Sequence, residues 1–190
     1  MKSLRLALML SATMSLSGCA GLFIAGAATT ANLVTDPRTT QQIWNDNQIE
    51  FEVAGLGNKP PYRGAARFVA SSYQGTVVLL GQARNTELLD QFITQAQKVK
   101  GVKELHNQVK IAEPLSVSAI SNDSWITTKV KSALLADSDL NGTKIKVITE
   151  AKEVYLFGYV SHEHADKATE IARNISGVKQ VIRAFEYGTE

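Results

Sequence analysis

Residues 76–82 read TVVLLGQ and residues 153–159 read EVYLFGY, and this pair of segments decides the fold. Each alternates apolar side chains up to a glycine, and the two glycines, Gly81 and Gly158, lie 77 positions apart. A helical segment follows each of them, and Gly-Val-Lys comes next, at residues 101–103 and 177–179. Self-similarity at a fixed spacing indicates a repeated structural unit. The chain is therefore predicted to contain one unit twice.

The second copy shows the elements of this unit most clearly. A helix is expected from Trp125 to about Ala136, with Asn122, Asp123 or Ser124 as its N-cap. Apolar spacing then predicts, in order, a strand at 144–149, a strand at 153–159, a helix with an apolar stripe at 165–175, and a strand at 179–187. The last strand should run parallel to the one before it, because a strand-helix-strand crossover is right-handed almost without exception.

The predicted fold class is α+β, with each copy an α-β-β-α-β sandwich of a three-stranded mixed sheet and two helices on one face. In the first copy, Trp44 is aligned with Trp125, which lies 81 positions later, so about four extra residues are expected near 59–62. Gly55 and Gly57 are expected to weaken the first helix of this copy.

Four glycines at matching places in the two copies are interpreted as structural: Gly81, Gly101, Gly158 and Gly177. Gly81 and Gly158 are expected to end a strand where the backbone bends or is closely approached, so valine at either position should disrupt its own domain. Gly177 is expected to stop a helix in the left-handed conformation.

The first residues have the layout of a secretory signal peptide. Lys2 and Arg5 precede an apolar run at 6–16, which is too short to cross a bilayer because a span needs roughly 20 apolar residues. The run ends in Leu-Ser-Gly-Cys at 16–19, which resembles the lipobox of bacterial lipoproteins. The resemblance implies a signal peptide at 1–18 and acyl chains, palmitate among them, on Cys19. The alternative is an ordinary signal peptide with a chance cysteine.

Cys19 is the only cysteine, so an intrachain disulfide is excluded. Residues 19–40 are interpreted as the lipidated cysteine and a flexible tether, because the stretch is rich in Ala, Gly and Thr. In lipoproteins of this type an aspartate after the cysteine usually means retention in the inner membrane. Ala20 therefore implies a lipid-anchored location in the outer membrane.

The charge balance gives no support for nucleic acid as a partner. The chain has 20 basic and 18 acidic residues, and Lys2 and Arg5 leave with the signal peptide. The mature chain is thus close to neutral, so any electrostatic recognition must come from local patches.

The sequence offers little for catalysis. It lacks Gly-x-Ser-x-Gly, and the glycine-rich stretch 55–58 lacks the lysine of a phosphate loop. His162 and His164 fall in a predicted helix, where side chains two positions apart diverge, and His106 falls in a strand by itself. We expect no catalytic residue, no metal site and no cofactor.

The first helix of the second copy is the best candidate for binding. Ile126, Val130, Ala133 and Leu134 form one apolar face that should pack on the sheet. The residues expected to bind lipid lie elsewhere on the helix: Trp125, Thr128, Lys129, Lys131, Ser132 and Leu135. An outward aromatic ring beside ammonium groups suits a membrane interface. The alternative is that Trp125 lies at the interface between the domains. In the first copy the aligned positions are polar or acidic, at Gln48, Glu50 and Glu52.

A strand ending in Leu-x-Gly, a helix and then a Gly-Val pair, together with Trp-Ile-Thr-Thr-Lys-Val at 125–130, resemble the BON domain family. The resemblance covers Gln41 to Tyr187 and places the domains at 41–112 and 122–190, with a linker at 113–121. Two such domains behind a lipobox resemble the dual BON-domain lipoproteins of Gram-negative outer membranes.

That resemblance implies a non-enzymatic protein whose mature chain faces the periplasm. It also implies binding of anionic phospholipid, above all phosphatidylglycerol, by the first helix of the second domain, and a role in envelope integrity at the division site. The competing prediction is a protein-interaction module for an envelope assembly machine or a protease, with strand edges near Val109 or Tyr187 open to a partner strand.

Overall fold

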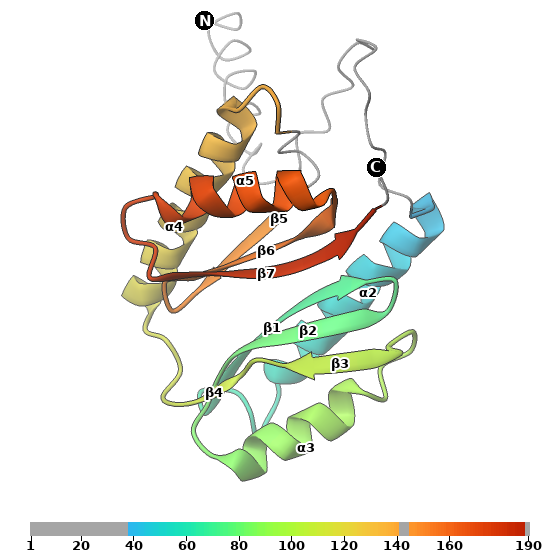
Figure 1. The fold of residues 1–190 in the computed structure, drawn as a ribbon. Helices are drawn as coiled ribbons and strands as arrows, with labels where there is room; N and C mark the ends of the chain where they lie inside the picture. The colour runs from blue at the N-terminus through green and yellow to red at the C-terminus, as the bar shows by residue number, and fades with distance from the viewer. Residues whose placement is uncertain (1–37, 141–144, 189–190) are drawn as a thin grey trace, which may run out of the picture. The chain divides into compact units, whose positions relative to one another are not determined.

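The computed structural model describes residues 38–140 and 145–188, and these two ranges belong to the same unit of the chain. The predictions for the signal peptide, for Cys19 and for the tether up to residue 37 lie outside the described residues. Within them, two copies of an α+β unit follow one another along the chain (Figure 1). The predicted fold class is confirmed.

The elements of the first copy are α2 (Thr40–Gly57), β1 (Ala66–Tyr73), β2 (Thr76–Ala83), α3 (Thr86–Ala96), β3 (Glu104–Asn107) and β4 (Lys110–Ile111). Those of the second are α4 (Val117–Ala136), β5 (Lys146–Glu150), β6 (Glu153–Val160), α5 (His162–Arg173) and β7 (Gln180–Tyr187). In both copies the central strand pairs antiparallel with the strand before it and parallel with the strand after the crossover helix. This is the predicted topology.

The third strand of the first copy is divided in two, which the sequence did not predict. β3 and β4 both lie parallel to β2, so this sheet has four strands where three were expected. Between them the Asn107 side chain accepts a hydrogen bond from the Val109 amide at 2.9 Å, while the Gln108 amide donates to Leu79. A side chain that turns back on its own backbone competes with the ladder and interrupts it.

Both first helices differ from prediction at their ends. α4 begins at Val117 with Ser116 as its N-cap, so residues 122–124 lie inside the helix and part of the predicted linker is helical. α2 starts from a capping box between Thr39 and Gln42 and runs through Gly55 to Gly57. The glycines do not break this helix, since they fall in its last turn, where few hydrogen bonds depend on them.

Each copy has its own apolar core between its helices and its sheet. In the first, Phe68 stacks on Phe92 and Tyr62 meets both rings edge-on. In the second, α4 and α5 contact each other and pack on the same sheet.

A third apolar cluster joins the two sheets through Leu80 of β2 and Tyr155 and Phe157 of β6. Beside it the buried Glu150 carboxylate accepts hydrogen bonds from Arg67 Nε at 3.1 Å and Gln82 Nε2 at 3.0 Å. Each sheet is therefore covered on both faces, by helices on one and by the other sheet on the opposite one.

Candidate membrane-binding surface

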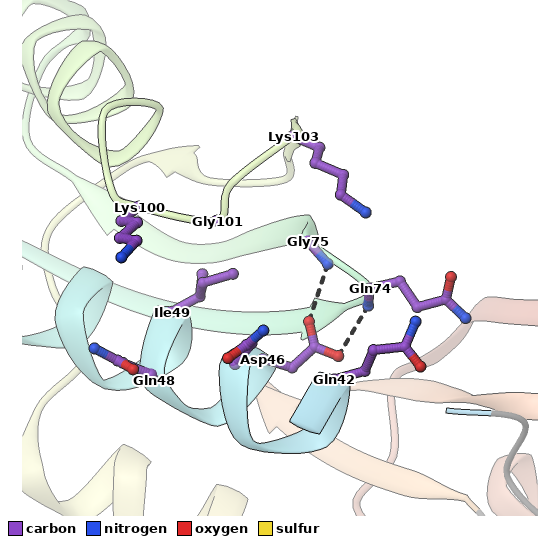
Figure 2. Close-up of a pocket in the computed structure, with 10 residues that line it drawn as sticks. Gln42, Asp46, Gln48, Ile49, Gln74, Gly75, Lys100, Gly101 and Lys103 are labelled. Atoms are coloured by element: carbon purple, nitrogen blue, oxygen red, sulfur yellow. Dashed lines mark hydrogen bonds between the residues drawn. The ribbon is translucent and has the colours of Figure 1, made fainter. Parts of the chain in front are cut away.

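Two buried aspartates fix how the two first helices correspond. Asp46 on α2 accepts hydrogen bonds from the Gln74 and Gly75 amides, at 2.9 and 3.0 Å, in the turn between β1 and β2 (Figure 2). Asp123 on α4 accepts from the amides of Ala151 and Lys152, at 2.7 and 2.9 Å, in the equivalent turn. The two aspartates are 77 positions apart in the sequence, which is also the spacing between Gly81 and Gly158.

The alignment of Trp44 with Trp125 is therefore wrong, and the four extra residues expected near 59–62 are not needed. At the spacing of 77, Gln48 corresponds to Trp125 and Glu52 corresponds to Lys129. The two tryptophans are exposed and so place no constraint on the register, whereas the buried aspartate of each helix binds the same turn and sets it. The corrected register keeps the conclusion that the first copy lacks the aromatic and basic groups of the second.

The environment of Asp46 shows how firmly this helix is held. Burial raises the pKa of the Asp46 carboxyl, but hydrogen bonds from Ser72, Gly75 and Gln74 and the Arg38 guanidinium outweigh burial, so the pKa lies below its ordinary value.

The same carboxylate lines a pocket of about 250 Å³. Lys100 and Lys103 lie across this pocket from α2 (Figure 2).

One flank of α4 is locked into the second domain. Ile126, Val130 and Leu134 are buried in its core. Gly177 has a φ of 99°, and a Cβ there would lie 3.2 Å from Ile126 Cδ1. It does not end a helix as predicted, since α5 ends at Arg173. Its role is to let the loop after α5 pass against α4.

The other flank of α4 carries large apolar side chains in contact with solvent. Trp125 is 62% exposed and Leu135 is 58% exposed. The indole is therefore not sealed between the domains, and the main alternative for this residue is wrong. Thr128, Lys131 and Ser132 are also exposed.

Lys129 lies differently from its neighbours. It is half-buried, and its Nζ donates to the Ser176 carbonyl in the loop that precedes Gly177. Its ammonium group is held at the edge of the exposed flank, whereas Lys131 extends from the helix with no ion pair to any described residue.

Sequence reasoning missed Val117, which is 84% exposed. It lies 18 positions before Leu135, about five helical turns at 3.6 residues per turn, so the two side chains project on one line of the helix. The residue was missed because the helix was expected to start at Trp125. The Ser116 cap followed by an apolar residue was the available indication.

The charges of the two first helices are opposite in sign. α4 carries Lys129 and Lys131, and its one acidic residue, Asp123, is buried against the turn. α2 carries Asp46, Glu50 and Glu52 and has no lysine or arginine. An anionic surface would therefore be attracted to α4 and repelled by α2.

The remaining predicted glycines lie where the backbone requires them. Gly81 is inside β2 and not at its end, with a φ of 125°, and a Cβ there would lie 1.9 Å from the Arg67 carbonyl oxygen. Gly158 likewise lies inside β6, with a φ of 151°. Gly101 has a φ of 97° and meets Ile49 as Gly177 meets Ile126.

Among the described residues, no group of three or more His, Cys, Asp or Glu side chains could hold a metal ion. His162 stacks on Tyr187, with ring centroids 4.1 Å apart, and His106 lies beside Glu104. Within residues 38–140 and 145–188, no helix is both long enough and apolar enough to cross a bilayer.

Known proteins share both the domain pattern and the full arrangement. The BON domain model matches residues 45–113 and 122–189. The chain is 41% identical over 184 residues to the outer membrane lipoprotein DolP of Haemophilus influenzae, covering 96% of this chain and 95% of that protein. It is therefore a member of the BON domain family, with two BON domains and a DolP-like organisation.

Two further relatives have other names. The chain is 40% identical over 153 residues to the 21 kDa hemolysin of Actinobacillus pleuropneumoniae, covering 80% of this chain and 79% of the hemolysin. It is 31% identical over 111 residues to osmotically-inducible protein Y of Escherichia coli, covering 57% of this chain and 55% of that protein.

Proposed function

We propose that this protein is a non-enzymatic outer-membrane lipoprotein whose second BON domain binds anionic phospholipid, such as phosphatidylglycerol, through α4. Acyl chains on Cys19 anchor it, and the mature chain faces the periplasm. The near full-length similarity to a protein named as an outer membrane lipoprotein supports the location. The lipobox-like segment at 16–19 supports the anchor.

The observation that carries lipid binding is the exposure of Trp125 on a helix whose opposite flank is buried. An indole that is fixed outward enters the headgroup region without rearrangement of the fold. Lys131 and Lys129 supply positive charge on the same helix, each worth about 1 kcal/mol near an anionic surface. Val117 and Leu135 extend the apolar contact toward the two ends of α4.

Attachment at two points explains how a small surface suffices. Two or three acyl chains hold a protein firmly at a bilayer, so contact by α4 need not supply the anchoring energy. Because the anchor keeps α4 near the membrane, its contact becomes effectively intramolecular. The weak contact then favours one lipid headgroup over another, so the protein accumulates where anionic lipid is abundant.

The test uses the chain from residue 20 onward, because acyl chains would hold the protein on any vesicle. Its binding to phosphatidylglycerol vesicles and phosphatidylcholine vesicles is measured, with Trp125→Glu as the variant. Trp44→Glu is the matched control, because Trp44 is 68% exposed but lies on the acidic α2. We expect Trp125→Glu to weaken binding to phosphatidylglycerol about tenfold or more, and Trp44→Glu to leave it unchanged. Undiminished binding by a folded Trp125→Glu variant would exclude the proposed surface.

The cellular part of the proposal is support of outer-membrane integrity and accumulation at the division site, where curved, anionic membrane would be the cue. A fluorescent fusion should lose its concentration at the septum when it carries Trp125→Glu and keep it with Trp44→Glu. If both variants still concentrate at the septum, lipid binding by α4 does not determine where the protein accumulates.

A further inference from the structure

The outer edge of β1 has backbone groups that the described structure leaves unpaired. β1 is an edge strand, and the Arg84 amide donates to the Ala65 carbonyl, which turns the odd-numbered residues of β1 toward β2. The even-numbered residues therefore direct their amides and carbonyls outward.

Two of these outward positions have partners near the ends of the strand. The Ala66 amide donates to the Tyr62 carbonyl at 2.8 Å, and the Ser72 amide donates to Glu50 Oε1 at 2.7 Å. Between them, no described residue pairs with the outward groups of Phe68 and Ala70. Unpaired edge groups of this kind are a template for another strand.

A groove of about 700 Å³ runs along this edge. It is lined by residues 66–70 of β1, by Phe51 and Ala54 of α2, and by Pro114, Leu115 and Ile120. Phe51 is 80% exposed. An aromatic side chain beside an open strand edge can hold the side chains of an added strand.

The chemistry of the groove selects an extended peptide. Only a backbone offers donors and acceptors at the spacing of Phe68 and Ala70, which a lipid chain cannot supply. Glu50 also lines the groove, but it is paired with Lys146 and accepts from the Ser72 amide. Arg67, the one basic residue in the lining, is held by Glu150. The described residues of the lining therefore carry no unpaired charge, and an extended apolar segment matches them.

We infer that the β1 edge binds an extended, apolar segment of a partner protein as an added strand of the first domain. Its outward groups pair with Phe68 and Ala70, and one of its side chains packs on Phe51. This site is formed mainly by the first BON domain, with Ile120 of α4 at its border, and it does not include the residues proposed to bind lipid. The protein would thus hold a membrane with one domain and a partner with the other.

The test uses the full lipidated chain in detergent micelles and a synthetic peptide of roughly eight residues, with alternating valine and threonine and two terminal lysines. The control peptide has the same side chains but N-methyl groups on all of its internal amides, so neither of its edges can donate to a ladder. We expect the first peptide to shift the Phe68 and Ala70 amide resonances and slow their hydrogen exchange. The methylated peptide should do neither.

Phe51→Ala and Trp44→Ala form a matched pair, since both aromatic rings are exposed on α2 and only Phe51 lines the groove. Phe51→Ala should weaken peptide binding about five- to tenfold, and Trp44→Ala by less than about twofold. The inference is overturned if neither amide responds up to the solubility limit of the peptide, if the methylated peptide binds equally, or if both variants lose the same affinity.

Discussion

Gly177 and Ile126 touch across the second domain so closely that a single added carbon would lie 3.2 Å from Ile126 Cδ1. This contact fixes the loop after α5 against α4, whose outer flank carries Trp125. The stability of the domain and the presentation of its exposed helix are therefore linked at one position.

Gly177→Ala should destabilise the protein by about 2–3 kcal/mol, because it adds the strain of a left-handed residue and a tight contact to which Ile126 must yield slightly. Gly64→Ala is the control: its φ is 79°, but a Cβ there meets nothing within 4 Å. That variant should lose only about 1–2 kcal/mol. Urea denaturation measures both, and equal losses would show that the contact with Ile126 contributes nothing.

Asp46→Asn should lower stability at neutral pH by about 1–3 kcal/mol, since the carboxylate receives two turn amides and the Ser72 hydroxyl. The pKa of Asp46 is lowered in the folded protein, so its contribution is complete above its ordinary value of 3.8 and is lost as the pH falls through the folded value. The difference between wild type and variant should therefore shrink in strong acid.

Denaturation at a series of pH values measures that difference. Asp90→Asn, at an exposed position on α3, is the control and should change stability little at any pH. A gap between wild type and Asp46→Asn that stays constant down to strong acid would contradict the assigned role.

Tyr155 should ionise late. Burial first, and then the charge and hydrogen bond of Glu153, raise its pKa to about 12 from an ordinary 10. A raised pKa stabilises the folded state fully below pH 10, and this contribution is lost as the pH rises through about 12. Ultraviolet titration of wild type should show a late tyrosine phase that Tyr155→Phe removes. The same late phase in the variant would assign it to another tyrosine, and Tyr62 is the candidate because burial also raises its pKa.

Glu150→Ala should destabilise the contact between the sheets by about 2–4 kcal/mol, because Arg67 and Gln82 would lose their shared acceptor at a buried site. Lys146→Ala breaks the more exposed ion pair with Glu50 and should change stability by less than about 1 kcal/mol. Chemical denaturation followed by probes in each domain compares them. Similar effects would mean that the buried carboxylate does not hold the sheets together.

The strands were predictable because residues 76–82 and 153–159 combine an apolar run with a glycine that the close approach of Arg67 requires in the first copy. The contact between the sheets has a weaker sequence signal: Leu80 and Phe157 make their strands nearly continuous apolar runs, as in strands covered on both faces. The exposed flank of α4 was predictable from helical spacing. Its start at Val117, the division of the last strand at Asn107 and the register of α2 depend on caps and buried side-chain hydrogen bonds, which apolar periodicity does not encode.

The cluster of Leu80, Tyr155 and Phe157 also limits how this protein can be divided. An isolated copy would expose that apolar surface to water, and such an exposed apolar patch favours aggregation. Each domain therefore depends on the other to keep this face of its sheet away from water, so neither can be removed without exposing the remaining one. In a fragment with one domain alone, any change in binding or stability will combine the loss of the other domain with the effect of exposing this apolar surface.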